Sequence, residues 1–235
     1  MSKILAVAFD LDGVLVDAKE WHYKAFRRAL NEHGFDILPE EHLAKFEGLP
    51  TRKKLEDLAE RMIIPKKLIP IIQAEKQKYF LETARKYCHD NPRLRNILFQ
   101  LQSSDRRLLV CSNAVRNTIE TLLHWMGIFD SFDFYLSNED VVLPKPSPEI
   151  YLKALHLLSV DPSELLVIED HERGIEAAQK AGAHVLQIGS SEDLTIELIE
   201  ETIQSIESMS EALEPFKKQP IPFYFKRQPS TLKIS

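Results

Sequence analysis

The sequence predicts an α/β fold of the doubly wound class, in which helices cover both faces of a parallel sheet. Short apolar runs rich in β-branched residues recur along the chain, and each ends in polar residues. Longer segments with helical periodicity lie between them, an alternation typical of a parallel sheet that is buried on both faces. The length of 235 residues suits one large domain, or a core domain joined to a smaller one.

Five apolar runs are expected to form the strands of this sheet. They cover residues 4–9, 108–111, 132–136, 165–168 and 184–188. About a hundred residues separate the first run from the second, whereas the later runs follow at shorter intervals. The long interval indicates that a second unit is inserted after the first strand.

The inserted unit is expected to be helical. Leucine, isoleucine and aromatic residues recur there at three- and four-residue steps, over 18–33, 51–62 and 66–87. This period is that of an amphipathic helix, and no run between these segments is typical of a strand. We therefore predict a core domain made of residues 1–16 and 89–214, interrupted by a helical cap over residues 17–88.

The composition excludes several classes of function. With 7 glycines and neither GxGxxG nor GxxxxGK[ST], the chain lacks the clustered glycine that a backbone phosphate cradle requires. Cys88 and Cys111 form no CxxC pair and no disulfide framework, which favours a cytoplasmic protein. The net charge of -6 and the lack of any long apolar stretch argue against nucleic-acid and membrane partners.

Residues 215–235 form a separate, basic and Pro-rich tail. All 36 acidic residues precede it, and it carries five Lys and Arg residues. An extended conformation is expected for such a segment. It could dock on the acidic body, mediate dimerisation or bind a partner, and the sequence leaves both a monomer and a homodimer open.

The first strand runs into FDLDG, which places Asp10 and Asp12 at its carboxyl end. Ligands bind at this edge of open α/β sheets. Two carboxylates two residues apart on an extended strand point the same way, and Gly13 allows a sharp turn directly after them. Considered alone, the pair also fits a capping role in the following turn.

Two later motifs place further polar side chains near strand ends. The second strand ends in Ser112 and Asn113, although Ser112 alone would suit the N-cap of a helix over 115–126. Lys145 lies between two prolines ahead of another helix, where a single lysine is usually solvated. Taken with the aspartates, these groups indicate a common ligand.

The fourth strand, LLVIED, ends in Glu169 and Asp170. Alone, these acids could serve the dipole of the following helix. Together with Asp10 and Asp12 they crowd negative charge into one crevice, which calls for a cation. Because all the ligands are carboxylate oxygens and no His/Cys pair is at hand, Mg²⁺ is the expected ion. With the ammonium and hydroxyl of the two preceding motifs, the site suits a phosphate dianion.

These motifs resemble those of the haloacid dehalogenase superfamily over roughly residues 4–189. Four segments carry the resemblance, in the order and spacing of the superfamily: Asp10-Leu11-Asp12-Gly13-Val14, Ser112-Asn113, Lys145-Pro146, and Glu169-Asp170 with Gly174-Ile175 and Ala177-Ala178. The helical insertion resembles the cap of the phosphatase and beta-phosphoglucomutase-like branch. The resemblance thus implies a Rossmann-like core with an inserted helical cap.

The resemblance also implies a mechanism. Asp10 would attack the substrate phosphorus and form an aspartyl-phosphate, while Asp12 would protonate the leaving oxygen and later activate water. The superfamily's true dehalogenases lack this second aspartate, so Asp12 favours phosphoryl chemistry.

The remaining motif residues would bind the metal and the phosphate. The resemblance implies that Mg²⁺ is held by Asp10, the Asp12 carbonyl and Asp170, with Glu169 as a ligand or as the partner of one. The phosphate oxygens would be held by Ser112, Asn113 and Lys145.

Three cap residues resemble substrate-contacting positions of the family. His22 lies in a stretch similar to the cap-entry helix, although a surface position is equally expected there. Gly48 and Arg52 resemble the substrate-specificity loop, and Arg52 could pair with a second anion on the substrate. The chain departs from the mutase pattern at Glu47 and Ala18, and a glutamate beside a phosphorylated sugar would repel it.

The sequence therefore predicts a Mg²⁺-dependent phosphatase of a small phosphorylated metabolite, such as a sugar phosphate or a phosphoglycolate-like compound. A phosphomutase is the alternative, since it would share Asp10 and Asp12 and differ in whether the cap excludes water. A non-catalytic binding protein on the same fold is disfavoured because every catalytic position is filled.

Overall fold

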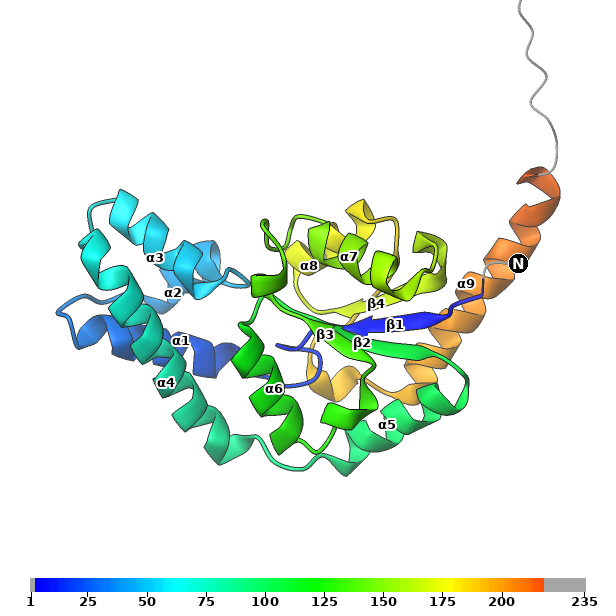
Figure 1. Cartoon of the computed structure of the whole chain (residues 1–235), viewed down its shortest axis with the longest axis horizontal. Helices are drawn as coiled ribbons and strands as arrows, with labels where there is room; N and C mark the ends of the chain where they lie inside the picture. The colour runs from blue at the N-terminus through cyan, green and yellow to red at the C-terminus, as the bar shows by residue number, and fades with distance from the viewer. Residues whose placement is uncertain (1–2, 218–235) are drawn as a thin grey trace, which may run out of the picture.

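The computed structural model describes residues 3–217 and contains one five-stranded parallel sheet (Figure 1). The strands are β1 (Ala6–Phe9), β2 (Arg107–Cys111), β3 (Phe134–Leu136), β4 (Leu165–Glu169) and β5 (His184–Gln187). Their order across the sheet is β3-β2-β1-β4-β5. This arrangement confirms the predicted doubly wound α/β fold.

The first strand lies at the centre of the sheet and pairs with β2 on one side and β4 on the other. Its side chains alternate between two hydrophobic layers, as the pleat of a strand requires. Val7 and Phe9 belong to one layer, whereas Ala6 and Ala8 belong to the other. The strand is buried throughout, so its carboxyl end is held firmly.

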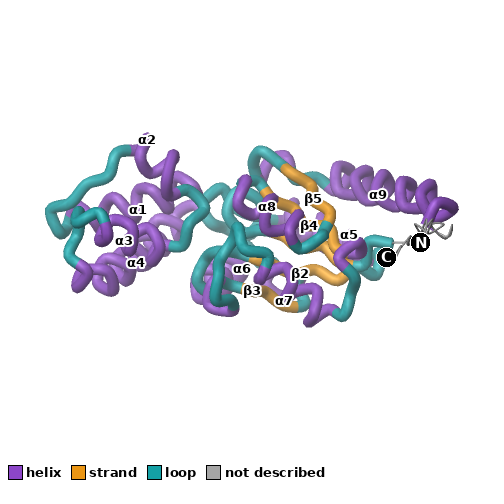
Figure 2. Tube along the Cα trace, turned by 90° about the horizontal axis from the view of Figure 1, so that it is seen from above, coloured by secondary structure: helices purple, strands orange, loops and turns teal. Residues whose placement is uncertain are grey.

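Helices cover both faces of the sheet (Figures 1 and 2). One face packs against α5 (Pro92–Ser103), α6 (Arg116–Trp125) and α9 (Ile196–Lys217). The other face packs against α7 (Glu149–Leu158) and α8 (Glu172–Lys180). Small residues such as Ala177 and Ala178 let α8 approach the sheet closely.

The segment between β1 and α5 is helical, and its helices gather at one end of the molecule (Figure 2). They are α1 (Lys19–Asn31), α2 (Pro39–Glu41), α3 (Thr51–Glu60) and α4 (Ile69–Tyr87). The two longest, α1 and α4, pack against each other, and α3 packs on α4. We call residues 17–88 the cap and the remaining described residues the core.

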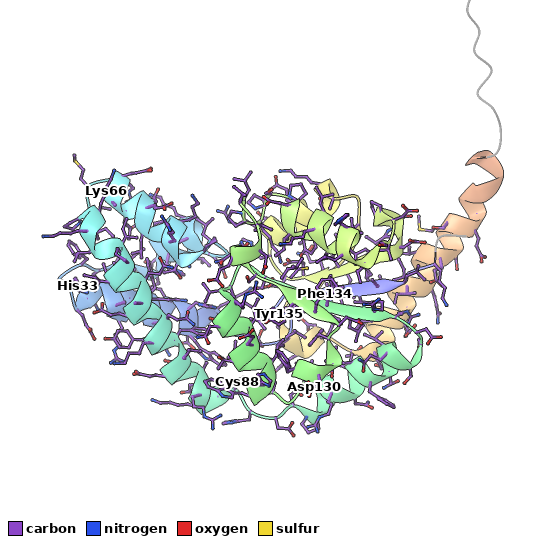
Figure 3. All side chains as sticks on the ribbon, viewed as in Figure 1. His33, Lys66, Cys88, Asp130, Phe134 and Tyr135 are labelled. Carbon is purple, nitrogen blue, oxygen red and sulfur yellow. The ribbon has the colours of Figure 1, made fainter. Side chains whose placement is uncertain are left out.

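Shorter helical turns complete the elements. They are η1 (His42–Phe46), η2 (Lys66–Leu68), η3 (Phe129–Ser131), η4 (Asn138–Asp140), η5 (Pro162–Glu164) and η6 (Ser191–Asp193). The chain returns from the cap to the core at Cys88, while His33 and Lys66 lie at the far end of the cap (Figure 3). Both cysteines are buried and free.

The basic tail predicted over 215–235 lies outside the described residues from position 218 onward. Its first three residues belong to α9. Among residues 3–217, no helix has the length and apolar character that a membrane span requires.

Candidate active site

The carboxyl ends of the three central strands bring the predicted carboxylates and hydroxyl together. Asp10 follows β1, Ser112 follows β2, and Glu169 and Asp170 lie at the end of β4. All four residues line one cavity of about 930 Å³ between the core and the cap. The sequence predicted this convergence because parallel strands end at the same edge of a sheet.

Gly13 lets the turn that follows β1 approach Asp170, the residue that follows β4. Its φ is +88°, a conformation that glycine adopts without strain. A Cβ built at this position would overlap the Asp170 carboxylate. The turn after Asp12 therefore packs directly against a carboxylate of the site.

The Lys145 ammonium lies between two carboxylates of the site, those of Asp10 and Glu169. Its Nζ donates to Asp10 Oδ1 at 2.8 Å, to Glu169 Oε1 at 2.6 Å and to the Cys111 carbonyl at 2.7 Å. Burial lowers the pKa of Lys145, but Asp10 and Glu169 outweigh it and raise the pKa well above its usual value. Lys145 is thus a fixed positive charge, with all three N–H donors engaged, rather than a solvated loop lysine.

The carboxylates form a set that fits a hard divalent cation. One oxygen each from Asp10, Glu169 and Asp170 lie within 4.8 Å of one another. Burial raises the pKa of Asp10 well above its usual value, and the Glu169 and Asp12 carboxylates raise it further against the effect of Lys145. Asp12 Oδ1 is buried without a hydrogen-bond partner in the described part of the chain. A bound cation would relieve this excess of negative charge, and Mg²⁺ prefers such all-oxygen ligands.

Asp12 is connected to the cap through His22. His22 Nε2 lies 2.9 Å from Asp12 Oδ2, and Lys76 Nζ lies 2.7 Å from His22 Nδ1. A lysine ammonium only donates, so Nδ1 accepts from Lys76 and Nε2 carries the proton that Asp12 accepts. Burial lowers the pKa of His22 to about 4. The imidazole is therefore neutral near pH 7 and links an ammonium to a carboxylate.

The two polar residues after β2 differ in their surroundings. Ser112 is 2% exposed, and its Oγ accepts from the Ala114 amide at 3.1 Å. Within residues 3–217 its hydroxyl donates to no group, so the proton is available to a ligand. The helix that Ser112 alone was expected to cap begins later, at Arg116, with Val115 as its N-cap.

The Asn113 side chain is occupied by backbone groups. Its Oδ1 accepts from the Lys145 amide at 3.0 Å, and its Nδ2 donates to the Gly48 carbonyl at 2.9 Å and to the Lys145 carbonyl at 3.3 Å. Asn113 thus holds the Lys145 loop and joins it to the cap. A phosphate contact from this residue stays a prediction.

The cap positions predicted to contact substrate, His22, Gly48 and Arg52, all line the cavity, and the Arg52 guanidinium is paired with an acid of its own helix. Gly48 has a φ of +71° and approaches His171 so closely that a Cβ would lie 3.1 Å from the imidazole. The Arg52 side chain is 72% exposed, and its Nε donates to Glu56 at 2.9 Å. The sequence thus predicted that the loop with Gly48 would lie at the cavity, whereas the position of the Arg52 guanidinium depends on its pairing with Glu56 in the helix that follows.

Sequence reasoning missed several charged and polar residues of the site. They are Lys19, His42, Lys54 and Lys76, which line the cavity, and Tyr151, whose hydroxyl donates to Glu169 Oε1 at 2.8 Å. For two of them a signal existed. Lys76 lies four residues from both Ile72 and Phe80, and Lys54 lies four residues before Leu58, so both occupy the buried face of a helix.

Comparisons with known proteins agree with this architecture. The model of the haloacid dehalogenase-like hydrolase family matches residues 7–188. A phosphorylated carbohydrates phosphatase from Thermotoga maritima is 31% identical over 180 residues, which cover 75% of this chain and 81% of the relative. A phosphoglycolate phosphatase from Aquifex aeolicus is 27% identical. That match covers 75% of this chain and 80% of the relative.

A solved structure shares this fold over most of the chain. The crystal structure of a beta-phosphoglucomutase from Clostridium difficile superimposes with a TM-score of 0.75 at 25% identity. The match covers 87% of this chain and 99% of that one. With the family match over residues 7–188 and this shared fold, the chain belongs to the haloacid dehalogenase-like hydrolase family.

Proposed function

We propose that the protein is a Mg²⁺-dependent phosphatase that hydrolyses a small phosphorylated metabolite through an aspartyl-phosphate on Asp10. The observation that carries this proposal is the position of Asp10. Its carboxylate lies at the end of the central strand, bound by the Lys145 ammonium and beside Glu169 and Asp170. A nucleophilic carboxylate needs such fixed positive charge beside it when a phosphate dianion approaches.

Two steps account for hydrolysis. An Asp10 oxygen attacks phosphorus, and the bond from phosphorus to the leaving oxygen breaks. Asp12, a carboxylate that accepts from His22 Nε2, takes up a proton that Lys76 supplies through His22 and passes it to the leaving oxygen. Asp12 then takes a proton from water as the water attacks the phosphorus, and the bond between phosphorus and Asp10 breaks. Inorganic phosphate leaves, Asp12 returns its proton through His22 to Lys76, and both aspartates are again carboxylates.

The described residues supply the groups that these steps require. Asp10, Glu169, Asp170 and the Asp12 carbonyl would hold Mg²⁺, which when bound supplies charge neutralisation for the phosphate oxygens. The Ser112 hydroxyl would donate to a phosphate oxygen, and Lys145 would bind one by exchanging a donor that Asp10 or the Cys111 carbonyl now accepts. The chain from Lys76 through His22 reaches Asp12, so it can deliver a proton to the residue that protonates the leaving group.

The names of the relatives support a phosphatase activity and suggest which phosphorylated metabolites to test as substrates. Two of them are named as phosphatases, one for phosphorylated carbohydrates and one for phosphoglycolate. The shared fold of a beta-phosphoglucomutase keeps the mutase as the second candidate. The departure from the mutase pattern at Glu47 favours the phosphatase over the mutase. We further propose residues 17–88 as a cap domain and a cytoplasmic location, which the two free cysteines support.

The experiment is a panel of phosphomonoesters incubated with the full-length protein and either MgCl₂ or EDTA. We expect inorganic phosphate to be released with Mg²⁺ and not with EDTA, and Asp10→Asn to abolish release. Conversion of a hexose 1-phosphate to its 6-phosphate without net release would favour the mutase instead. Full activity in Asp10→Asn would overturn the mechanism.

A further inference from the structure

Two cap lysines are buried without a carboxylate partner. Lys54 on α3 is 5% exposed and Lys76 on α4 is 4% exposed. Throughout the described part of the chain, neither forms an ion pair with an acidic residue. Lysine is almost never this buried unless its charge is paired, because removing an ammonium from water is costly. Both side chains line the cavity that contains Asp10.

The groups that touch these ammonium ions do not neutralise them. Lys54 Nζ lies 3.3 Å from His42 Nε2 and 5.7 Å from the centre of the Phe26 ring. Lys76 Nζ lies 2.7 Å from His22 Nδ1. Burial, with the nearby lysine charges, lowers the pKa of His42 to about 3, so this imidazole can accept a hydrogen bond but carries no balancing charge.

Charged groups on the surrounding elements act on Lys54 in both directions. Lys76 on α4 and Arg173 on α8 repel its charge, whereas Asp12 after β1 and Glu47 on the cap loop attract it. The two acids do not outweigh burial, which lowers the pKa of Lys54 to about 7 and that of Lys76 to about 8. The two lysines at the cap side of the cavity therefore lack, among the described residues, an anionic partner close enough to hold them in the charged form.

We propose that Lys54, together with Lys76, binds a second anionic group of the substrate, a carboxylate or a second phosphate, while Asp10 attacks the first phosphate. This inference rests on the proposed function and names the substrate class of the same site. The substrate is then a phosphomonoester that carries another anion a few bonds away, and not an otherwise neutral sugar phosphate. An anion placed between the two ammonium ions supplies the partner that the protein itself lacks.

The neighbouring positions on α3 show why Lys54 is the residue to test. The Lys53 side chain is 55% exposed and donates to Glu56 at 3.1 Å, and Arg52 points to the same glutamate. Arg52 and Lys53 are exposed and paired with Glu56, whereas Lys54 is buried and has no acidic partner in the described part of the chain. Lys53 is therefore a matched control one residue away.

The experiment compares paired substrates that differ in the second anion. We would measure kcat/KM for 2-phosphoglycolate against 2-hydroxyethyl phosphate, and for glucose 1,6-bisphosphate against glucose 6-phosphate. The wild type is expected to prefer the charged member of at least one pair. Lys54→Met should lower that preference roughly thirtyfold, since losing one partner of a buried charge pair is worth about that factor. Lys54→Arg should restore much of it, and Lys53→Met should leave the preference unchanged.

A binding measurement without turnover completes the test. Asp10→Asn protein loaded with Mg²⁺ would be titrated with 2-phosphoglycolate at pH 8.5 in two buffers of different ionisation enthalpy. We expect the protein to take up protons when 2-phosphoglycolate binds, because its carboxylate favours the charged forms of Lys54 and Lys76. Adding Lys54→Met should reduce this uptake.

The outcomes separate this inference from the proposed function. Phosphate release from no phosphomonoester refutes the phosphatase itself. Release without any preference for a second anion, or a preference that Lys54→Met leaves intact, refutes the anion site while the phosphatase stands. A preference for the carboxylate pair assigns the second anion as a carboxylate, and a preference for the bisphosphate assigns it as a phosphate.

Discussion

Lys19 Nζ lies 2.7 Å from Asp170 Oδ2, so the first residue of a cap helix contributes a positive charge to the carboxylate cluster of the core. The same ammonium lies 3.9 Å from Glu47 Oε1. The Asp170 side chain is 1% exposed, whereas that of Lys19 is 46% exposed. Lys19 therefore pairs with Asp170, a carboxylate that a bound divalent metal would also use.

From this contact we predict that Lys19→Met increases the affinity of the protein for Mg²⁺ severalfold. Removing the ammonium leaves Asp170 free for the metal, and solvent screening of the half-exposed lysine limits the gain. Isothermal titration of the metal-free protein with MgCl₂ measures it. Lys24→Met is the control, because Lys24 lies on the same helix and pairs with exposed Glu20. Equal or weaker Mg²⁺ binding in Lys19→Met would contradict competition.

Replacing Lys54 should stabilise the protein. Lys54→Met removes a buried, unpaired charge and keeps the length of the side chain, so we expect the free energy of unfolding to rise by about 1–3 kcal/mol. Thermal and urea unfolding would measure the change beside Lys53→Met, for which a change near zero is expected. If Lys54 serves only the packing of the cap, the variant will be less stable than the wild type.

The stabilisation by Lys54→Met should depend on pH. Burial lowers the pKa of Lys54 from 10.5 to about 7 in the folded protein. As pH falls below 10.5 the unfolded chain gains a proton that the folded protein takes up only near pH 7, so the lysine increasingly opposes folding over that window. Below about pH 7 both states are protonated and the effect is constant. The difference in Tm between variant and wild type is expected to grow from pH 10 to pH 7, and a flat difference would refute the shift.

Gly13→Ala should damage the site beyond the effect of backbone strain. At Gly13 a Cβ overlaps the Asp170 carboxylate, whereas at Gly34, with a similar φ of +80°, it meets nothing within 4 Å. Both alanine variants carry a strain of about 1–3 kcal/mol. Only Gly13→Ala is expected to weaken Mg²⁺ binding, by roughly 10- to 100-fold, the range seen when support around a metal site is lost. Equal Mg²⁺ affinities in the two variants would show that Asp170 moves aside freely.

Asn113→Asp should loosen the contact between cap and core. The substitution keeps the acceptor for the Lys145 amide but replaces the Nδ2 donor with a repelling oxygen, which removes the bond to the Gly48 carbonyl and the longer one to the Lys145 carbonyl. The loss of about 1 kcal/mol favours an open cap severalfold. Small-angle X-ray scattering would detect it as a larger radius of gyration, and an unchanged radius would indicate that other contacts, such as Gln77 to Thr118 at 2.8 Å, suffice.

How far the sequence predicts the site depends on which physical rule places each residue. Asp10, Ser112 and Asp170 are placed by the end of a parallel strand, a rule that needs only the strand assignments. The sequence predicts that Arg52 could pair with a second anion because guanidinium groups suit anions, and this stays a prediction. The helix phase set by Leu55 and Leu58 buries Lys54 and leaves the Arg52 side chain exposed. That phase was readable in the sequence, as a lysine within an apolar stripe.

Other contacts could not be read in this way. The Asn113 side chain meets backbone groups of two distant loops, and Lys19 meets Asp170 only once the cap is docked. Such contacts depend on where whole segments lie relative to each other. Neither periodicity nor residue type determines that placement.

The three bonds of Asn113 also bear on the turnover cycle. Two of them hold the backbone of Lys145 within the core, and only the third reaches across to Gly48. If the cap opens in the proposed cycle to release phosphate, only that third bond has to break. The backbone of Lys145, whose side chain faces the proposed nucleophile Asp10, would keep both of its bonds to Asn113 from one substrate molecule to the next.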